Sequence, residues 1–198
     1  MSSRWRKTFG GSVWCAAALV ISPHVGAAAP SAAMLVNPCS SCHGALGASA
    51  GLTLPSLAGL PKTLVIDAMQ EFKRGVRPSS VMGRIAKAYT DEDFAVMGDY
   101  FASQKRHVTK QNLDPERVAK GAKLFPLSCG GSACHVVVGR STEDDPPAVA
   151  SQWLGYLQIQ MDLYVNGQRK MPMRMGESIK ALSAADRDAL LHYFASVQ

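Results

Sequence analysis

The stretch Cys39-Ser40-Ser41-Cys42-His43 decides the fold of this chain. Two cysteines separated by two residues and followed directly by histidine are the signature for covalent attachment of haem c. On a helical turn, side chains three residues apart lie on the same face, so both thiols can reach the two vinyl groups of one porphyrin. The stretch therefore predicts a haem bound through thioethers to Cys39 and Cys42, with His43 as an axial ligand of the iron.

Other interpretations of this cysteine pair are a zinc site, a redox-active pair or a disulfide. Zinc needs more Cys or His ligands than one such pair supplies. Apart from the motif histidines, the exported chain offers only His107 and His192. Neither lies at a spacing typical of a ligand, so we expect both to be ordinary surface or packing residues.

A second Cys-His unit, Cys129-Gly130-Gly131-Ser132-Ala133-Cys134-His135, has four residues between its cysteines. Its two glycines allow the backbone angles that a bulged loop needs. The unit predicts a second haem attached through Cys129 and Cys134, with His135 as axial ligand. A disulfide and a degenerate haem site are the competing interpretations.

An internal repeat favours the second haem. Shifting the chain by 92 residues places His43 on His135, and the match continues through nearly the whole exported chain. A degenerate site would not be expected to keep its iron ligands. The matched pairs are Pro55 with Pro147, Ala58 with Ala150, Met69 with Met161, Gly75-Val76-Arg77 with Gly167-Gln168-Arg169 and, after a one-residue insertion, Met82-Gly83 with Met175-Gly176, Lys87-Ala88 with Lys180-Ala181, and Tyr100-Phe101-Ala102-Ser103 with Tyr193-Phe194-Ala195-Ser196.

The repeat also predicts the domain organisation. We expect a first domain over residues 29–106, a linker over residues 107–115 and a second domain over residues 116–198.

The pattern of apolar residues is helical in both halves, and no clear alternating strand stands out. We expect helices over Leu64–Phe72 and Leu154–Val165, and capping boxes at Thr90–Asp93 and Ser183–Asp186 predict the starts of two more. The sequence thus predicts an all-α fold of two tandem cytochrome c domains. Each is wrapped on one covalent haem, which supplies the apolar mass that a small domain lacks.

Each iron needs a sixth ligand, and a methionine thioether would favour the ferrous state. The repeat selects Met82 in the first half and Met175 in the second, because the two occupy equivalent positions after their motif histidines. Two further methionines compete with Met175, and three others lie in helical patterns typical of core residues. The competitors are Met171 and Met173, and the expected core residues are Met69, Met97 and Met161.

Pro55 and Pro147 follow the two motifs at equal distances. A backbone carbonyl at each position could accept a hydrogen bond from Nδ1 of the axial histidine and fix its ring. A simple turn is an equally good interpretation of both prolines.

Residues 1–28 are typical of a cleaved secretory signal peptide, with a basic start, an apolar run over residues 12–21 and small residues near a cleavage site at 27–29. The run is shorter than the ~20 apolar residues that span a bilayer. We therefore expect a periplasmic protein without a membrane span. Removing the three basic residues of the leader leaves 18 basic against 15 acidic residues, a net charge of +3 that is too mild to indicate nucleic-acid binding.

From about Leu35 to its end, the chain resembles the dihaem cytochrome subunit of flavocytochrome c sulfide dehydrogenase and, more broadly, the cytochrome c4-like dihaem proteins. The most specific block is Val81-Met82-Gly83-Arg84-Ile85-Ala86-Lys87. Three further stretches support the resemblance. They are Asn37 to Gly44, Glu71 to Gly75, and Gln152-Trp153 with Tyr156-Leu157-Gln158. The chain departs from the family at Cys129 to Cys134, where the usual motif is two residues shorter, and this leaves the pose of the second haem open.

The resemblance implies a partner and a direction of electron flow. An FAD-containing flavoprotein would oxidise sulfide, and electrons would pass through two haem c groups to a soluble acceptor cytochrome. The chain would not be an enzyme by itself. Two alternatives stay open: a stand-alone carrier of the c4 type that serves a terminal oxidase, and a haem peroxidase or gas sensor with an open iron position.

Overall fold

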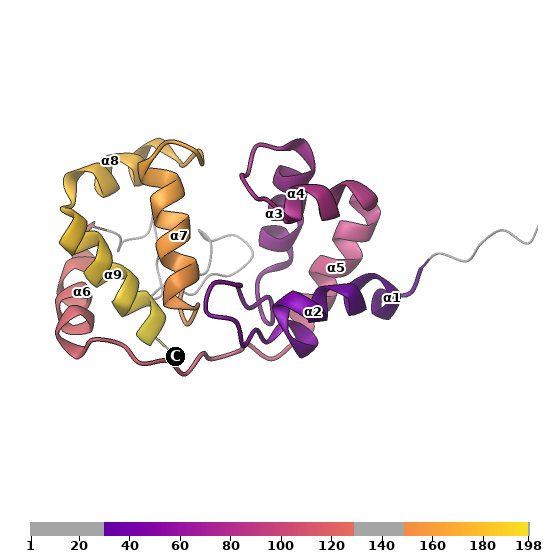
Figure 1. The fold of residues 1–198 in the computed structure, drawn as a ribbon, viewed down its shortest axis with the longest axis horizontal. Helices are drawn as coiled ribbons and strands as arrows, with labels where there is room; N and C mark the ends of the chain where they lie inside the picture. The colour runs from indigo at the N-terminus through magenta and orange to yellow at the C-terminus, as the bar shows by residue number, and fades with distance from the viewer. Residues whose placement is uncertain (1–29, 129–148, 198) are drawn as a thin grey trace, which may run out of the picture.

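The computed structural model describes residues 30–128 and 149–197. Within these ranges every regular element is a helix, which confirms the predicted all-α class. Two groups of helices stand side by side, and the segment 104–114, which has no helix, joins them along one edge (Figure 1). No helix in the described ranges is long and apolar enough to cross a membrane.

The first group runs from α1 to α5. Its members are α1 (Ala32–Val36), α2 (Ser40–His43), α3 (Lys62–Arg74), α4 (Met82–Ile85) and α5 (Asp91–Ser103), with 3-10 turns at Asn37–Cys39, Ala45–Gly47 and Ala86–Ala88. The second group runs from α6 to α9. Its members are α6 (Pro115–Ser128), α7 (Leu154–Val165), α8 (Met173–Ala181) and α9 (Ala184–Ser196).

The helices predicted from the sequence are present. α7 has the predicted bounds, and α3 extends two residues beyond the predicted range at each end. Thr90 and Asp93 form a reciprocal capping box at the start of α5, with hydrogen bonds of 3.1 and 2.8 Å. At the start of α9 the Ser183 hydroxyl accepts a hydrogen bond from Asp186 N. The Asp186 carboxylate accepts from the Ser183 hydroxyl over 2.6 Å, and not from the Ser183 backbone N–H as a capping box requires.

Each group has its own apolar core. In the first, Phe94 and Met97 of α5 are almost fully buried, and Met69 packs with them from α3. In the second, Leu190 and Phe194 of α9 pack against partners on α6 and α7. The core role predicted for Met69 and Met97 is confirmed. Burying one side chain of this size stabilises a fold by roughly 1.5–3 kcal/mol.

The repeat seen in the sequence recurs in the backbone. Gly59 and Ser151 occupy equivalent positions, and both have positive φ, 70° and 58°. Each N–H donates to a phenylalanine carbonyl of the last helix in its group, over 2.8 Å from Gly59 to Phe101 and 2.9 Å from Ser151 to Phe194. A positive φ is costly for serine, and hydrogen bonds from Thr109 to the hydroxyl and carbonyl of Ser151 hold it in place.

The close packing of α6 on α9 depends on Gly121. A Cβ at this position would stand 2.2 Å from the Ala189 carbonyl oxygen and 2.7 Å from Cβ of Tyr193. Both atoms are too near to move aside without shifting a helix. The two helices can therefore approach each other this closely only because residue 121 is glycine.

We predict that Gly121→Ala lowers the thermal unfolding midpoint of the protein. Helix propensity alone would stabilise α6 by up to ~1 kcal/mol with alanine, whereas overlap with Ala189 would separate α6 from α9. The sign of the change, measured by thermal unfolding, decides between the two effects. A raised midpoint would contradict the packing described for Gly121.

Candidate functional site

His43 is held in a defined orientation at the end of α2. Its side chain is buried, and Nδ1 lies 2.8 Å from the carbonyl oxygen of Pro55. The hydrogen bond predicted for Pro55 is therefore present. A carbonyl only accepts, so Nδ1 carries the proton and Nε2 keeps its lone pair. Burial lowers the pKa of His43, and the hydrogen bond to Pro55 only partly offsets this, so the ring is the neutral imidazole that metal ligation needs.

Cys39 and Cys42 are free thiols on the same short helical segment as His43. Cys39 is half-buried against the first core, and burial raises the pKa of its thiol. Cys42 is exposed. Since the two are not joined to each other, the disulfide interpretation of this pair does not apply to the structure.

The donor set fits a covalently attached haem c. Two free thiols with an adjacent neutral histidine supply two thioether positions and one nitrogen ligand. Apolar side chains next to the candidate ligands are also uncovered, with 59% of Leu46, 48% of Val81 and 40% of Ile85 exposed. A large apolar cofactor would bury surface of this kind.

Met82 begins α4, and its backbone is fixed by the turn before it. Ser79 Oγ accepts hydrogen bonds from Met82 N (2.9 Å) and Val81 N (3.3 Å). The Arg84 guanidinium donates twice to the Ser80 carbonyl, over 2.7 and 3.0 Å. The Met82 side chain is half-buried at the edge of the first core. Its role as axial ligand stays a prediction.

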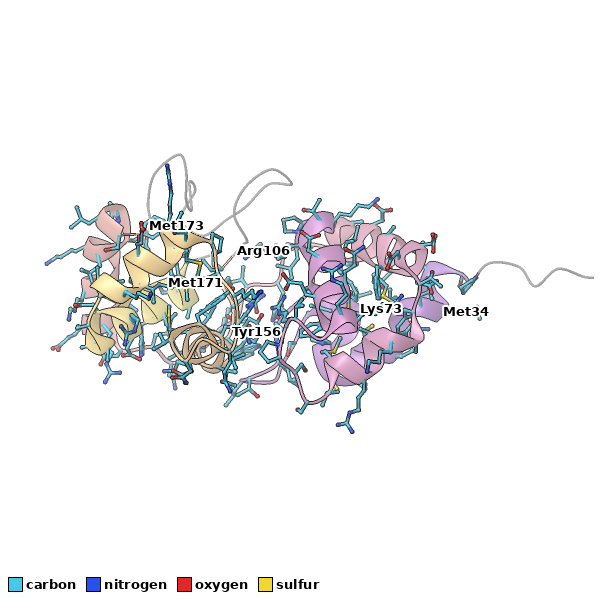
Figure 2. All side chains as sticks on the ribbon, turned by 90° about the horizontal axis from the view of Figure 1, so that it is seen from above. Met34, Lys73, Arg106, Tyr156, Met171 and Met173 are labelled. Atoms are coloured by element: carbon cyan, nitrogen blue, oxygen red, sulfur yellow. The ribbon has the colours of Figure 1, made fainter. Side chains whose placement is uncertain are left out.

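In the second half, Cys129, Cys134, His135 and Pro147 lie outside the described residues. The three candidate methionines differ in exposure. Met173 is 79% exposed, whereas Met171 and Met175 are half-buried. Figure 2 labels Met171 and Met173. Met171 packs beside Gly176, with its sulfur 3.6 Å from where a Cβ of residue 176 would stand. Met175 remains the ligand predicted from the repeat, and Met171 is its nearest competitor.

The loop that carries Pro55 is held by the second half of the chain. The Gln152 side chain accepts from Ser56 N (3.0 Å) and donates to the Ser56 carbonyl (2.7 Å). Trp153 Nε1 donates to the Ser49 carbonyl over 3.0 Å. All four residues are buried. The backbone that fixes His43 is thus itself fixed from the other half.

Spacing within the sequence did not single out this contact. Gln152 and Trp153 stand out there only through the family resemblance.

The two histidines expected to be packing or surface residues agree with that expectation. His192 is buried and accepts a 3.3 Å hydrogen bond from Asp114 N, and His107 is half-buried in the joining segment.

No family model matches the chain. It is 30% identical over 174 residues to the thiosulfate dehydrogenase electron acceptor of Stutzerimonas stutzeri, a match that covers 80% of this chain and 78% of that protein. Reduced cytochrome c4 from Pseudomonas stutzeri superposes with a TM-score of 0.73 at 25% identity, covering 82% of this chain and 95% of that one. The chain belongs to the cytochrome c4-like family of dihaem c-type cytochromes.

Further comparisons agree with this dihaem cytochrome family. The cytochrome subunit of sulfide dehydrogenase from Chlorobaculum tepidum is 41% identical over 71 residues, 35% of this chain and 64% of that protein. Cytochrome c4 from Pseudomonas aeruginosa is 38% identical over 87 residues, 44% of this chain and 42% of that protein. These two matches thus span less than two thirds of either relative. The cofactors of this cytochrome are two haem c groups, as the sequence predicts.

Gly44, which ends α2 directly after His43, offers a test of this turn. Its φ is 77°, and a Cβ would stand 2.0 Å from the Ala48 carbonyl oxygen. Gly75 is a matched control, because its φ is 73° but nothing lies within 4 Å of its Cβ position. We predict that Gly75→Ala destabilises by about 1–2 kcal/mol and that Gly44→Ala destabilises by clearly more. Denaturant unfolding of the holoprotein measures both, and equal losses would show that the turn is not tight.

The contact between the halves gives a second prediction. Gln152→Ala leaves the buried N–H and C=O of Ser56 without partners, at a cost of about 1–3 kcal/mol for each unsatisfied group. Gln158→Ala is the control, since Gln158 is exposed and makes one long contact of 3.4 Å to Asp188. We expect the control to change stability by less than ~0.5 kcal/mol. Indistinguishable unfolding curves for the two variants would show that the Gln152 side chain does not stabilise the Ser56 loop.

Proposed function

We propose that this dihaem cytochrome is the electron-transfer subunit of an oxidoreductase complex that acts on a reduced sulfur compound. Its donor is an FAD-containing flavoprotein that oxidises sulfide, and its acceptor is a soluble cytochrome. The chain is exported to the periplasm, with residues 1–28 removed as a signal peptide. The observation that carries the electron-transfer role is the neutral, buried His43, oriented by Pro55 beside two free thiols.

The proposed ligand sets follow the repeat. The first consists of Cys39, Cys42, His43 and Met82, and the second of Cys129, Cys134, His135 and Met175. Pro55 and Pro147 orient the two axial histidines. When bound, each haem iron alternates between the ferric and ferrous states and so carries one electron.

The protein's own contribution is to keep each ligand in place, so that little moves when the charge changes. In the first half this requires that His43 stay neutral and keep one orientation. The carbonyl of Pro55 holds the Nδ1 proton, which leaves Nε2 free to bind iron. The Ser79 hydroxyl holds the backbone N–H of Met82, and the Arg84 side chain holds the Ser80 carbonyl two residues before it.

The sulfur-compound donor is supported by the names of two relatives. One is the cytochrome subunit of sulfide dehydrogenase, and the other is the electron acceptor of thiosulfate dehydrogenase. Both are proteins that serve the oxidation of reduced inorganic sulfur. The flavoprotein donor is what the resemblance to flavocytochrome c sulfide dehydrogenase implies. The relative named for sulfide dehydrogenase is the more similar of the two over the segment that it matches.

A specific observation also favours a second candidate, the stand-alone c4 carrier. The chain covers 95% of one cytochrome c4 structure, with no large part of that protein left unmatched. Purification of the native protein from the periplasm separates the two candidates. A flavin-containing chain at equal stoichiometry, reduced by sulfide and able to reduce the haems, supports the proposed complex. A dihaem monomer that purifies without a second chain and is not reduced by sulfide supports the carrier.

Met82 as a sixth ligand predicts a specific spectral change. Met82→Ala should abolish the sulfur-to-iron absorption band near the red end of the ferric spectrum for one of the two haems. Met34→Ala is the control, because Met34 is 68% exposed and outside the core. If Met82→Ala leaves the ferric spectrum unchanged, Met82 is not an iron ligand. If the wild type already lacks the band for that haem, the iron has an open position, as in a haem peroxidase or gas sensor.

The second half is tested in the same way. Met175→Ala should remove the sulfur-to-iron band of the other haem, whereas Met171→Ala and Met173→Ala should keep it. The mass of the exported chain together with a pyridine haemochrome assay should give two haems and an N-terminus near residue 29. If only Met171→Ala loses the band, Met171 and not Met175 is the ligand of the second iron.

A further inference from the structure

The candidate methionine ligands lie on two equivalent stretches of chain, which we call the methionine segments. The first, residues 75–90, begins at Gly75, which ends α3 with a φ of 73°, and runs to Thr90, which caps α5. It contains Met82. The second, residues 167–183, begins at Gly167 (φ 70°) and runs to Ser183, which caps α9. It contains all three candidate methionines of its half.

The first end of each methionine segment is held in the same way in both halves. An arginine two residues after the glycine donates its backbone N–H to the last turn of the preceding helix, and its guanidinium stacks on an aromatic ring of that turn. The arginine, carbonyl and ring belong to Arg77, Glu71 and Phe72 in the first half, and to Arg169, Leu163 and Tyr164 in the second. At this end, equivalent residues make equivalent contacts.

The second end of each methionine segment is bound by a cationic side chain. Lys73 Nζ donates to the Tyr89 carbonyl over 2.7 Å. Arg187 Nη1 donates to the Leu182 carbonyl over 2.6 Å. Tyr89 and Leu182 occupy equivalent positions of the repeat, each one residue before a helix cap. The same backbone carbonyl therefore binds a cation in both halves.

The two cations, however, do not occupy equivalent positions. The position equivalent to Lys73 is Val165, which has no hydrogen-bond donor in its side chain and is 46% exposed. The position equivalent to Arg187 is Phe94, which is buried in the first core. One contact is thus made from α3 in the first half and from α9 in the second. Repetition of one sequence would place the cation at one position, so a contact made from two positions indicates a requirement that both halves share.

The contact made by Lys73 joins two helices. Its ammonium also lies 3.8 Å from the carboxylate of Asp91, the first residue of α5, and 5.4 Å from the centroid of the buried Phe94 ring. Figure 2 labels Lys73 on the first group of helices. Because Lys73 is in the last turn of α3, its bond to Tyr89 ties the end of α3 to the start of α5 and closes the first methionine segment.

Met82 lies inside this closed segment. The helix that it begins, α4, packs against α3, as does the following turn Ala86–Ala88. A Cβ at Gly83 would stand 3.7 Å from the Phe72 carbonyl oxygen, so the start of α4 is next to the last turn of α3. Tyr89 packs against the same core as Met82. A ligand on a segment that is already ordered loses less entropy when it binds, so closing the segment strengthens the bond of its methionine.

We propose that Lys73 and Arg187 are positioning residues that hold the two methionine segments closed and so keep a methionine on each iron. Neither side chain has to touch the haem. Lys73 spans 16 residues of chain and Arg187 only five, so Lys73 has the larger part in closing its segment. This inference rests on the proposed function, because it requires a methionine as the sixth ligand of each iron.

Imidazole is a probe of how readily each segment opens, because it binds six-coordinate ferric iron only after the methionine has left. Lys73→Met removes the donor and keeps a long apolar side chain. We expect it to raise the imidazole affinity of the first haem about fivefold, as the loss of one hydrogen bond implies. Lys73→Arg keeps a cationic donor and should stay close to the wild type. Loss of the sulfur-to-iron band during imidazole titration of the holoprotein measures the affinity, and haem content shows that each variant is loaded.

Lys62→Met is the matched control. Lys62 is on the same helix α3, and its side chain is 34% exposed against 37% for Lys73. Its ammonium binds Asp99 of α5 at 2.8 Å, outside the methionine segment, so its loss should leave the imidazole affinity unchanged. Equal affinities in Lys73→Met and Lys62→Met would overturn the role of Lys73, as would equal rises in Lys73→Met and Lys73→Arg. Arg187→Met should raise the affinity of the other haem by a smaller factor, and no rise there would overturn the role of Arg187.

Met82→Ala separates this inference from the proposed function. It opens the sixth position, so one haem should bind imidazole far more tightly, which identifies that haem as the first. If Met82→Ala changes neither the band nor the affinity, the ligand assignment fails and the role of Lys73 fails with it. If Met82→Ala behaves as expected and Lys73→Met matches Lys62→Met, only the role of Lys73 fails. Two haems per chain and their reduction by a sulfide-oxidising partner would stand in either case.

Discussion

The hydrogen bond between His43 and the carbonyl of Pro55 is the interaction on which the first site depends. At 2.8 Å it fixes the ring and decides which nitrogen keeps its lone pair. Two sets of hydrogen bonds hold the loop that brings Pro55 to this position. Within the first half, Ser49 N donates to Ser56 Oγ. From the second half, the Gln152 side chain bonds the backbone N–H and carbonyl of Ser56. The orientation of the His43 ring in the first half therefore depends on contacts made by the second half.

This dependence makes the chain more than two carriers joined by a linker. The contacts between the halves are mostly buried hydrogen bonds to backbone groups, and separating the halves would leave those groups without partners. Gly155 adds a close approach, because a Cβ there would stand 2.9 Å from the carbonyl oxygen of Leu52. Contacts of this kind favour one fixed arrangement of the two sites, which suits electron transfer because little has to reorganise.

Local patterns in the sequence were sufficient for much of the fold. The capping box at Thr90 and the spacing of Phe94, Met97 and Phe101 predict α5, because a helix start and a buried helix face depend on residues close in sequence. The hydrogen bond from His43 to Pro55 was also accessible, as one of two equal interpretations, because only 12 residues separate the partners. Contacts between the halves were not accessible in this way, since Gln152 and Ser56 are 96 residues apart and no periodicity links them.

The repeat explains both what could be extended from one half to the other and where that extension fails. Features that depend only on their own half recur, such as the arginine stacked on an aromatic ring after a helix-ending glycine. The contact surface does not recur: the position equivalent to Gln152 is Leu60, which is buried in the first core and has no amide to offer. The second half thus supplies the Gln152 side chain, and the first half supplies the Ser56 backbone that it binds. Because two copies of one fold meet through unlike surfaces, their irons need not share a potential even if their ligands are identical in kind.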